Sequence, residues 1–226
     1  MKILEIEINT DNLLETEHFY SNVLGLSLVN KEQNTISYLA GQSKLTFLKS
    51  KDQKPTYHFA FNIPHNKLDE AINWATVRLS LIENTDNGLV ANFDSWNAKA
   101  IYFQDNNNNI LEFIARFDLS NSTTNPFDIS SIQSISEIGI VTDSPLNLAE
   151  KMVKENNLSY FSKSTYSEQF AALGNDNGLF VIVENNRNWY PTKQKAEKHY
   201  TKIKIETHGL ISEMIINDEN VNPTLA

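Results

Sequence analysis

The 226-residue sequence predicts an α+β protein built from repeated βαβββ units, and three observations indicate this fold class. One strand pattern, one helix pattern and three further strand patterns follow one another over residues 1–50. The same order starts again at residue 57. A segment that begins at residue 135 then repeats the start of the chain at a constant offset of 132 residues, which predicts an internal duplication.

The first unit opens with "ILEIEI", in which side chains alternate between two faces as they do in a half-buried strand. Apolar residues at helical spacing between Leu13 and Leu24 predict a helix, with Asp11 or Asn12 as its N-cap and Gly25 at its C-terminal end. Three short strands follow, around residues 26–29, 35–40 and 44–49.

The second unit begins with the strand pattern "YHFAFNIP" and continues with a helix whose apolar side runs from Leu68 to Ala75. It ends with the strand patterns "KAIYFQD" and "ILEFIAR", which the run "NNNN" joins. Asp105 and the asparagines tolerate the positive φ angles of a tight hairpin, so the run predicts a turn rather than a disordered spacer. The strand after this turn carries one carboxylate, Glu112.

Residues 119–131 are rich in Ser, Thr, Asn and Pro and predict a linker between two domains. The first domain covers residues 1–118, and the second covers residues 132–226, with Glu137 at the position of Glu5. Strands at "FAALG" and "LFVIVE" complete the third unit. The remaining segment, "YTKIKIETHGLISEMIIND", supplies two strands, so the second copy is incomplete.

Composition and charge exclude several classes of function. The formal net charge is -9 and the chain has no basic cluster, so we expect no nucleic-acid partner. The chain contains no cysteine, which excludes disulfides, thiolate metal sites and cysteine nucleophiles. Charges interrupt the apolar run at the N-terminus, so we expect no secretory signal, no membrane span and a cytoplasmic location. A Gly-rich phosphate loop and a G-x-S-x-G motif are also lacking.

Three motifs, in order along the chain, resemble the vicinal oxygen chelate superfamily of glyoxalases, fosfomycin-modifying enzymes, extradiol dioxygenases and bleomycin-resistance proteins. The helix of this family commonly reads FY-x-x-x-LG, as "FYSNVLG" does here. The strand "HFAF" follows, and the hairpin "YFQDNNNNILEF" keeps the family frame F-x-D-x-x-x-N-x-x-E, with asparagines in place of its usual Pro and Gly. The resemblance is strongest over residues 1–118 and weakest at the C-terminal end.

The resemblance implies that two βαβββ units pair so that their sheets curl into a cup, often with a divalent metal inside. It also implies metal ligands at Glu5, His58 and Glu112, where the family usually has His at the first position. One imidazole and two carboxylates suit Mn²⁺, Fe²⁺ or Mg²⁺ and also accept Zn²⁺, and a cup without metal is the alternative. Because two carboxylates neutralise a divalent ion, we expect a weaker Lewis acid than two His and one Glu give. Glu7, or a displaced Glu5, is the expected general base.

Each expected ligand also has a structural alternative. Glu5 recurs as Glu137 in a unit without an evident His partner, so it can equally be a salt-bridged strand residue. His58 can be a hydrogen-bonded core histidine. Glu112 shares its strand face with isoleucines on either side, so as a buried carboxylate it needs a metal, a cationic partner or water.

The sequence therefore predicts a protein that binds a small molecule in a β-sheet cup, with metal-assisted lyase or isomerase, transferase or dioxygenase chemistry in an enzymatic version. Tyr57, Trp96 and Tyr102 are the expected pocket residues, with ordinary core or rim packing as the alternative. A metal-free protein that sequesters a drug or metabolite and a non-catalytic interaction module are the other functions considered. Either a homodimer or internal pairing of the two halves is compatible with the sequence.

Overall fold

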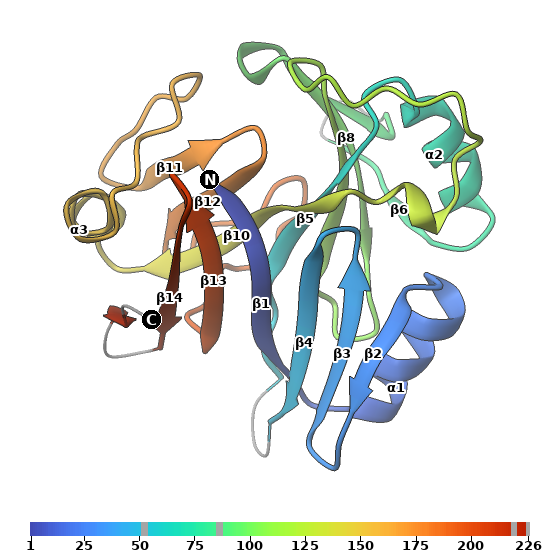
Figure 1. Ribbon diagram of the computed structural model, residues 1–226, viewed down its shortest axis with the longest axis horizontal. Helices are drawn as coiled ribbons and strands as arrows, with labels where there is room; N and C mark the ends of the chain where they lie inside the picture. The colour runs from blue at the N-terminus through green and yellow to red at the C-terminus, as the bar shows by residue number, and fades with distance from the viewer. Residues whose placement is uncertain (51–53, 85–87, 218–220, 225–226) are drawn as a thin grey trace.

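The computed structural model describes residues 1–50, 54–84, 88–217 and 221–224 and has the predicted α+β architecture (Figure 1). The strands form a curled, mixed sheet, and the helices lie at its periphery (Figure 1). None of the described helices is long and apolar enough to cross a membrane.

The elements follow the predicted order of units. The first unit contains β1 (Lys2–Thr10), α1 (Leu13–Glu17), the π-helical turn η1 (His18–Val23), β2 (Ser27–Lys31), β3 (Thr35–Ala40) and β4 (Ser43–Lys49). The second contains β5 (His58–Ile63), α2 (Leu68–Thr76), β6 (Leu81–Ile82), β7 (Val90–Phe93), the short helix η2 (Asp94–Trp96), β8 (Ala98–Gln104) and β9 (Ile110–Arg116). After η3 (Ile129–Ser131), the third contains β10 (Ser134–Thr142), α3 (Pro145–Asn156), β11 (Phe170–Asn175) and β12 (Gly178–Glu184). The C-terminal strands are β13 (Thr201–Thr207), β14 (Leu210–Ile216) and β15 (Val221–Thr224), the last of which the sequence did not predict.

The predicted start and end of the first helical segment are confirmed. The Asn12 side chain accepts hydrogen bonds from the backbone N–H groups of Leu14 and Glu15, and Gly25 has a φ of 82°. The segment differs from the single α-helix predicted, because α1 continues after Glu17 as the wider turn η1. Local signals therefore predicted both ends of the segment but not its change from an α-helix to a π-helical turn.

The units pair across the linker rather than within residues 1–118. Strand β1 pairs antiparallel with β13 and parallel with β4, while β5 pairs antiparallel with β10 and parallel with β9. These registers correct the expectation that the first and second units share a cup: the second unit shares one with the third. The first strands of the units carry the same alternating pattern, so the pattern does not specify which of them pair. The internal duplication and the domain division at residues 119–131 stay predictions.

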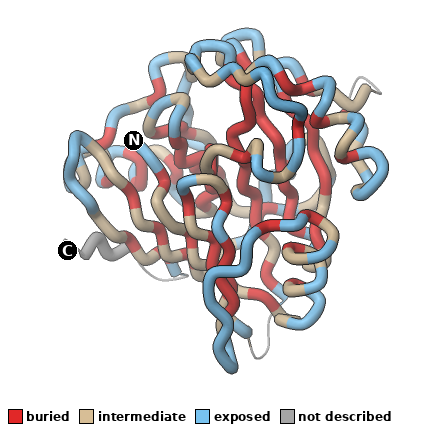
Figure 2. The backbone as a smooth tube through the Cα atoms, turned by 45° about the vertical axis from the view of Figure 1, so that its right-hand side comes forward, coloured by how far each residue is buried: buried red, intermediate tan, exposed pale blue. Residues whose placement is uncertain are grey.

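Two apolar clusters cover the two faces of the central strands. The main core lies between the sheet and the helices, and Figure 2 shows buried residues running along the central strands. A smaller cluster lies on the other face of β5, β8 and β9 and includes Ala60, Tyr102, Ile114 and Trp189. Every residue of β5 and β9 is therefore buried, and side chains on the second face are shielded from water.

The asparagine run forms a hairpin turn, which confirms the prediction. Asn108 has a φ of 62°, and the Asp105 carboxylate accepts hydrogen bonds from the backbone N–H groups of Asn107 and Asn109. The side-chain oxygen of Asn109 in turn accepts a hydrogen bond from the backbone N–H of Tyr57 at 2.8 Å. The turn therefore holds the start of β5 against the start of β9.

The buried hydroxyl of Tyr20 belongs to the same network, because it donates a hydrogen bond to the Asp105 carboxylate at 2.7 Å. We expect Tyr20→Phe to lower the free energy of unfolding by about 1.5–3 kcal/mol, as for other hydrogen bonds to charged groups. Tyr166→Phe is the matched control, because Tyr166 is exposed and its ring stays stacked on Tyr160. Urea denaturation measures both changes, and equal stability of the two variants would contradict the role of the Tyr20 hydroxyl.

Candidate functional site

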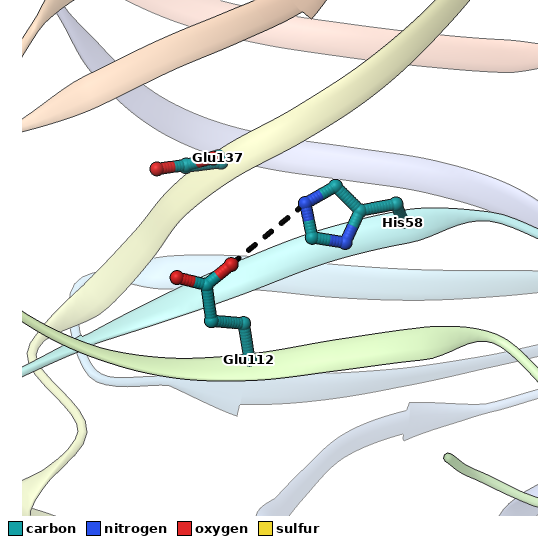
Figure 3. Close-up of side chains that lie close together, drawn as sticks. All are labelled: His58, Glu112 and Glu137. Carbon is teal, nitrogen blue, oxygen red and sulfur yellow. Dashed lines mark ion pairs between the residues drawn. The ribbon is translucent and has the colours of Figure 1, made fainter. Parts of the chain in front are cut away.

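Three buried side chains converge on the second apolar face (Figure 3). His58 comes from β5, Glu112 from β9 and Glu137 from β10, and their ligand-type atoms lie within 4.8 Å of one another. Ala60 lies opposite Glu112 in the β5–β9 register and opposite Glu137 in the β5–β10 register. Because the methyl group of Ala60 is small, the centre of this face has room for two longer carboxylates.

The backbone orients the imidazole of His58. Its Nδ1 atom donates a hydrogen bond to the carbonyl oxygen of Ile110 at 3.0 Å, so Nε2 carries the lone pair and lies 3.8 Å from Oε2 of Glu112. Burial lowers the pKa of His58, and the charge of Glu137 opposes this shift only in part. The ring therefore favours its neutral form, which is the form that binds metal ions.

Glu112 is 2% exposed, and its Oε1 atom has no hydrogen-bond partner among the described residues. Burial raises the pKa of Glu112 well above its ordinary value, and the charge of Glu137 raises it further. Tyr102 lies directly across the β8–β9 ladder, and its pKa is also raised by burial and by these carboxylates. The Tyr102 hydroxyl and the charge of Arg116 oppose the rise in the pKa of Glu112 only in part, and the Oε1 atom without a partner lowers the stability of the fold.

A buried arginine compensates the other carboxylate. Arg116, the last residue of β9, is fully buried and forms an ion pair with Glu137. Its Nε atom donates a hydrogen bond to the Ser136 hydroxyl at 3.1 Å, and its Nη1 atom lies 3.5 Å from the Asp176 carboxylate. Glu112 remains the less compensated carboxylate of the group, because Arg116 pairs with Glu137 rather than with it.

The three converging side chains line a cavity of about 280 Å³. Its walls are mainly aromatic and contain Phe93, Trp96, Tyr102, Phe170, Trp189 and Tyr190. Val181, Val183, Arg187 and Asn188 complete the lining. A mostly apolar cavity with a few convergent polar groups is the usual form of a small-molecule site.

One wall of the cavity is the loop that joins β12 to β13. Gln194 attaches this loop to the asparagine turn by donating a hydrogen bond to the carbonyl oxygen of Asn108 at 3.0 Å. Trp189 packs on Gly139 of β10, where a Cβ atom would lie 2.5 Å from the indole ring. The centre of this ring lies 5.1 Å from that of His58. Residue 139 is glycine, therefore, because the indole occupies the space that a side chain would need.

Two of the three predicted pocket residues, Trp96 and Tyr102, line the cavity. Tyr57 lies on the other face of β5, in the main core, and its hydroxyl donates a hydrogen bond to the carbonyl oxygen of Tyr200 at 2.8 Å. Glu7 also lies away from the lining residues, and its carboxylate accepts a hydrogen bond from the Tyr200 hydroxyl at 2.7 Å. The role of Glu7 as a general base stays a prediction without a geometric link to this cavity.

Glu5 does not join His58 and Glu112. It forms an ion pair with Lys44 at 3.0 Å and accepts a hydrogen bond from the Thr46 hydroxyl at 3.1 Å. The physical reason is strand pairing, because β1 has β13 rather than β5 as its long antiparallel neighbour. The salt-bridged alternative considered for this residue is the one that the structure shows.

Sequence reasoning missed two members of the site, Glu137 and Arg116. The offset of 132 residues places Glu137 on Glu5, so the repeat contained the signal, and the choice of Glu5 followed from pairing the wrong units. Arg116 ends an apolar strand pattern, and no pattern in the sequence indicates that it is fully buried.

Comparison with known proteins places the fold. No family model matches the sequence, and no curated protein matches it either. A solved structure from Bacillus subtilis subsp. subtilis str. 168, described as a candidate dioxygenase, is 13% identical with a TM-score of 0.60, and the match covers 98% of this chain and 83% of that one. The fold is therefore the glyoxalase/bleomycin-resistance/dioxygenase fold, which confirms the predicted fold class.

Shorter matches cover about half of this chain. A glyoxalase/bleomycin resistance protein/dioxygenase from Alicyclobacillus acidocaldarius is 20% identical over 52% of this chain and 92% of its own, with a TM-score of 0.42. The fosfomycin resistance protein FosX from Listeria monocytogenes, complexed with Mn(II) and sulfate ion, is 15% identical over 51% of this chain and 89% of its own, with a TM-score of 0.39.

Proposed function

We propose that this protein binds a small molecule in the cavity and that His58, Glu112 and Glu137 hold a divalent metal ion beside it. The observation that carries the proposal is the buried, unpartnered carboxyl oxygen of Glu112, next to the Nε2 lone pair of His58 and a second carboxylate. A cation bound by this group would account for a carboxyl that is buried this deeply and that Tyr102 and Arg116 compensate only in part.

The donor set fits such an ion. One imidazole nitrogen and two carboxylates suit Mn²⁺ or Fe²⁺ and also accept Zn²⁺ or Mg²⁺. The hydrogen bond from Nδ1 of His58 to a backbone carbonyl is a usual outer contact of metal-binding histidines. Arg116 does not make the site positive, because its guanidinium lies between Glu137 and Asp176, and the charges of a divalent ion, Arg116 and the three carboxylates sum to zero. We therefore still expect a weaker Lewis acid than two His and one Glu give.

A bound ion supplies Lewis-acid polarisation of a ligand oxygen. The chain contributes the rest of the site. The Ile110 carbonyl holds His58 in one orientation, Arg116 holds Glu137, and the aromatic walls exclude water from the ligand. Lyase, isomerase, transferase and dioxygenase chemistry on a small oxygen-containing molecule are each compatible with this arrangement.

Elemental analysis of protein purified without chelator tests the proposal. We expect about one equivalent of divalent metal in the wild-type protein and in His65→Ala, and less than about one tenth of that amount in His58→Ala. His65 is the matched control because its ring contacts the carbonyl oxygen of Leu119 and lies outside the cavity. Negligible metal in the wild-type protein, even after incubation with Mn²⁺, Fe²⁺ and Zn²⁺, would overturn the proposal.

Two observations favour a second candidate function, the metal-free sequestration of a small molecule. Arg116 already compensates Glu137, and the raised pKa of Glu112 favours a neutral carboxyl that needs no cation. A ligand would then raise the melting temperature by the same amount with and without EDTA. A rise that EDTA abolishes would favour the metal centre instead.

A further inference from the structure

The cavity contains a cation that the proposed metal centre does not use. Arg187 lies in the loop after β12 and lines the cavity, with its guanidinium carbon 5.1 Å from the centre of the Phe170 ring. No carboxylate in the described part of the chain forms an ion pair with Arg187. Arg187 is exposed, and the aromatic contact holds its guanidinium beside the cavity and leaves its donors available to a ligand.

The walls of the cavity consist of aromatic side chains that pack on one another in pairs. Phe93 and Trp96 have ring centres 5.9 Å apart, and those of Tyr102 and Tyr190 are 5.6 Å apart. A cavity of about 280 Å³ has room for one substituted six-membered ring. Face and edge contacts with these walls favour an aromatic ligand over a saturated ring of the same size.

The polar groups beside the cavity favour a ligand with hydrogen-bond acceptors. The indole N–H of Trp189 is buried and has no acceptor among the described residues, although Trp189 lines the cavity. The indole and the Arg187 guanidinium both donate and neither accepts. The chain as a whole carries a formal charge of -9, so an anion that enters this cavity needs a local cation.

We propose that the ligand of this cavity is a small aromatic carboxylate, whose ring lies between the aromatic walls and whose carboxylate binds the guanidinium of Arg187. The choice of cavity rests on the proposed function. The contact between the ligand carboxylate and Arg187 does not require the metal ion. Either proposal can therefore be wrong while the other holds.

Calorimetric titration with benzoate, benzamide and cyclohexanecarboxylate measures separately how much the negative charge and the aromatic ring of the ligand contribute to its affinity. We expect the wild-type protein to bind benzoate about tenfold or more tightly than neutral benzamide, which is the effect of a charge-assisted hydrogen bond. Benzoate should also bind about threefold or more tightly than cyclohexanecarboxylate, which has the same charge but no aromatic face.

Arg187→Gln should lose the preference for benzoate and bind benzamide as the wild-type protein does. Arg78→Gln is the matched control, because Arg78 also stacks on an aromatic ring, that of Trp74 at 4.6 Å, but lies outside the cavity. Equal affinities of the wild-type protein for benzoate and benzamide, a preference that survives in Arg187→Gln, or no binding of any probe would overturn the inference. Equal affinities for benzoate and cyclohexanecarboxylate would overturn its aromatic part.

Metal content distinguishes the failure of this inference from that of the proposed function. Arg187 is not among the proposed ligands, so Arg187→Gln should hold as much metal as the wild-type protein. A benzoate preference that depends on Arg187, in protein that takes up no metal, supports the inference and overturns the metal centre. If the wild-type protein and Arg187→Gln both hold metal but the wild-type protein has no preference for benzoate, the metal centre is supported and the inference is overturned.

Discussion

Exchange of Glu137 for glutamine is expected to lower the affinity for Mn²⁺ by at least about 100-fold, whereas the same exchange at Glu5 should change it by less than about twofold. The two residues hold equivalent positions in the predicted repeat, but only Glu137 lies with His58 and Glu112. Glu5 is engaged by Lys44 instead. Calorimetric titration of chelator-treated protein with Mn²⁺ measures both affinities, and circular dichroism reports whether each variant is folded.

The two exchanges also differ in their effect on stability. Glu137→Gln leaves the buried guanidinium of Arg116 with only the more distant Asp176 carboxylate, and breaking a buried pair costs up to about 3–5 kcal/mol. Glu5 is in a partly exposed pair, whose loss costs about 0–1 kcal/mol. Combining Glu137→Gln with Arg116→Gln removes both buried charges and keeps the metal test usable if the single variant folds poorly. Full Mn²⁺ affinity in folded Glu137→Gln, or loss of affinity in Glu5→Gln, would contradict the assignment.

The order and type of the elements could be predicted because their signals are local. The Asn12 cap, the Gly25 helix end and the turn at Asp105 each act through residues a few positions away. The pairing of units could not be predicted in this way, since β1 and β10 share one alternating pattern and either could pair with β5. Only hydrogen bonds between residues far apart in the sequence distinguish the two arrangements.

The site residues also differ in whether local patterns or long-range pairing determine their positions. His58 and Glu112 lie on neighbouring strands, β5 and β9, of one unit. The asparagine turn joins β8 to β9 and holds the start of β5 through Asn109, which helps to set the register of these strands. Local patterns therefore predicted both residues. Glu137 comes from the next unit, and its place depends on the pairing that the pattern leaves open. The burial of Arg116 depends in turn on Glu137 and Asp176, two carboxylates distant from it in the sequence. A strand pattern records the period of apolar residues and carries no information about such long-range charge compensation.

Glu112→Gln is expected to stabilise the metal-free protein near neutral pH by about 1–3 kcal/mol, the cost of a buried group without a partner. Burial raises the pKa of Glu112, so the folded protein holds this proton more tightly than the unfolded chain does. The stability contributed by this group is therefore complete below the pKa of the unfolded chain, about 4.3, and is lost as the pH rises through the folded-state pKa. Glutamine has nearly the same shape and never ionises, so the variant does not suffer this loss.

The pH dependence separates this effect from a change in packing. Urea denaturation in EDTA should give similar free energies of unfolding for both proteins near about pH 4, and a growing advantage of Glu112→Gln towards about pH 8. Glu7→Gln is the matched control, because the Glu7 carboxylate is only partly buried and accepts a hydrogen bond from the Tyr200 hydroxyl, so no such gain is expected.

Added Mn²⁺ should stabilise the wild-type protein and the control but not Glu112→Gln. If Glu112→Gln were less stable than the wild-type protein at both pH values, the carboxyl would have to be held by a partner in the metal-free protein, and the proposed cation site would lose its main support. If Glu112→Gln is more stable than the metal-free wild-type protein, Glu112 lowers stability until a metal ion binds. A buried residue of this kind is expected where binding is selected at the expense of stability.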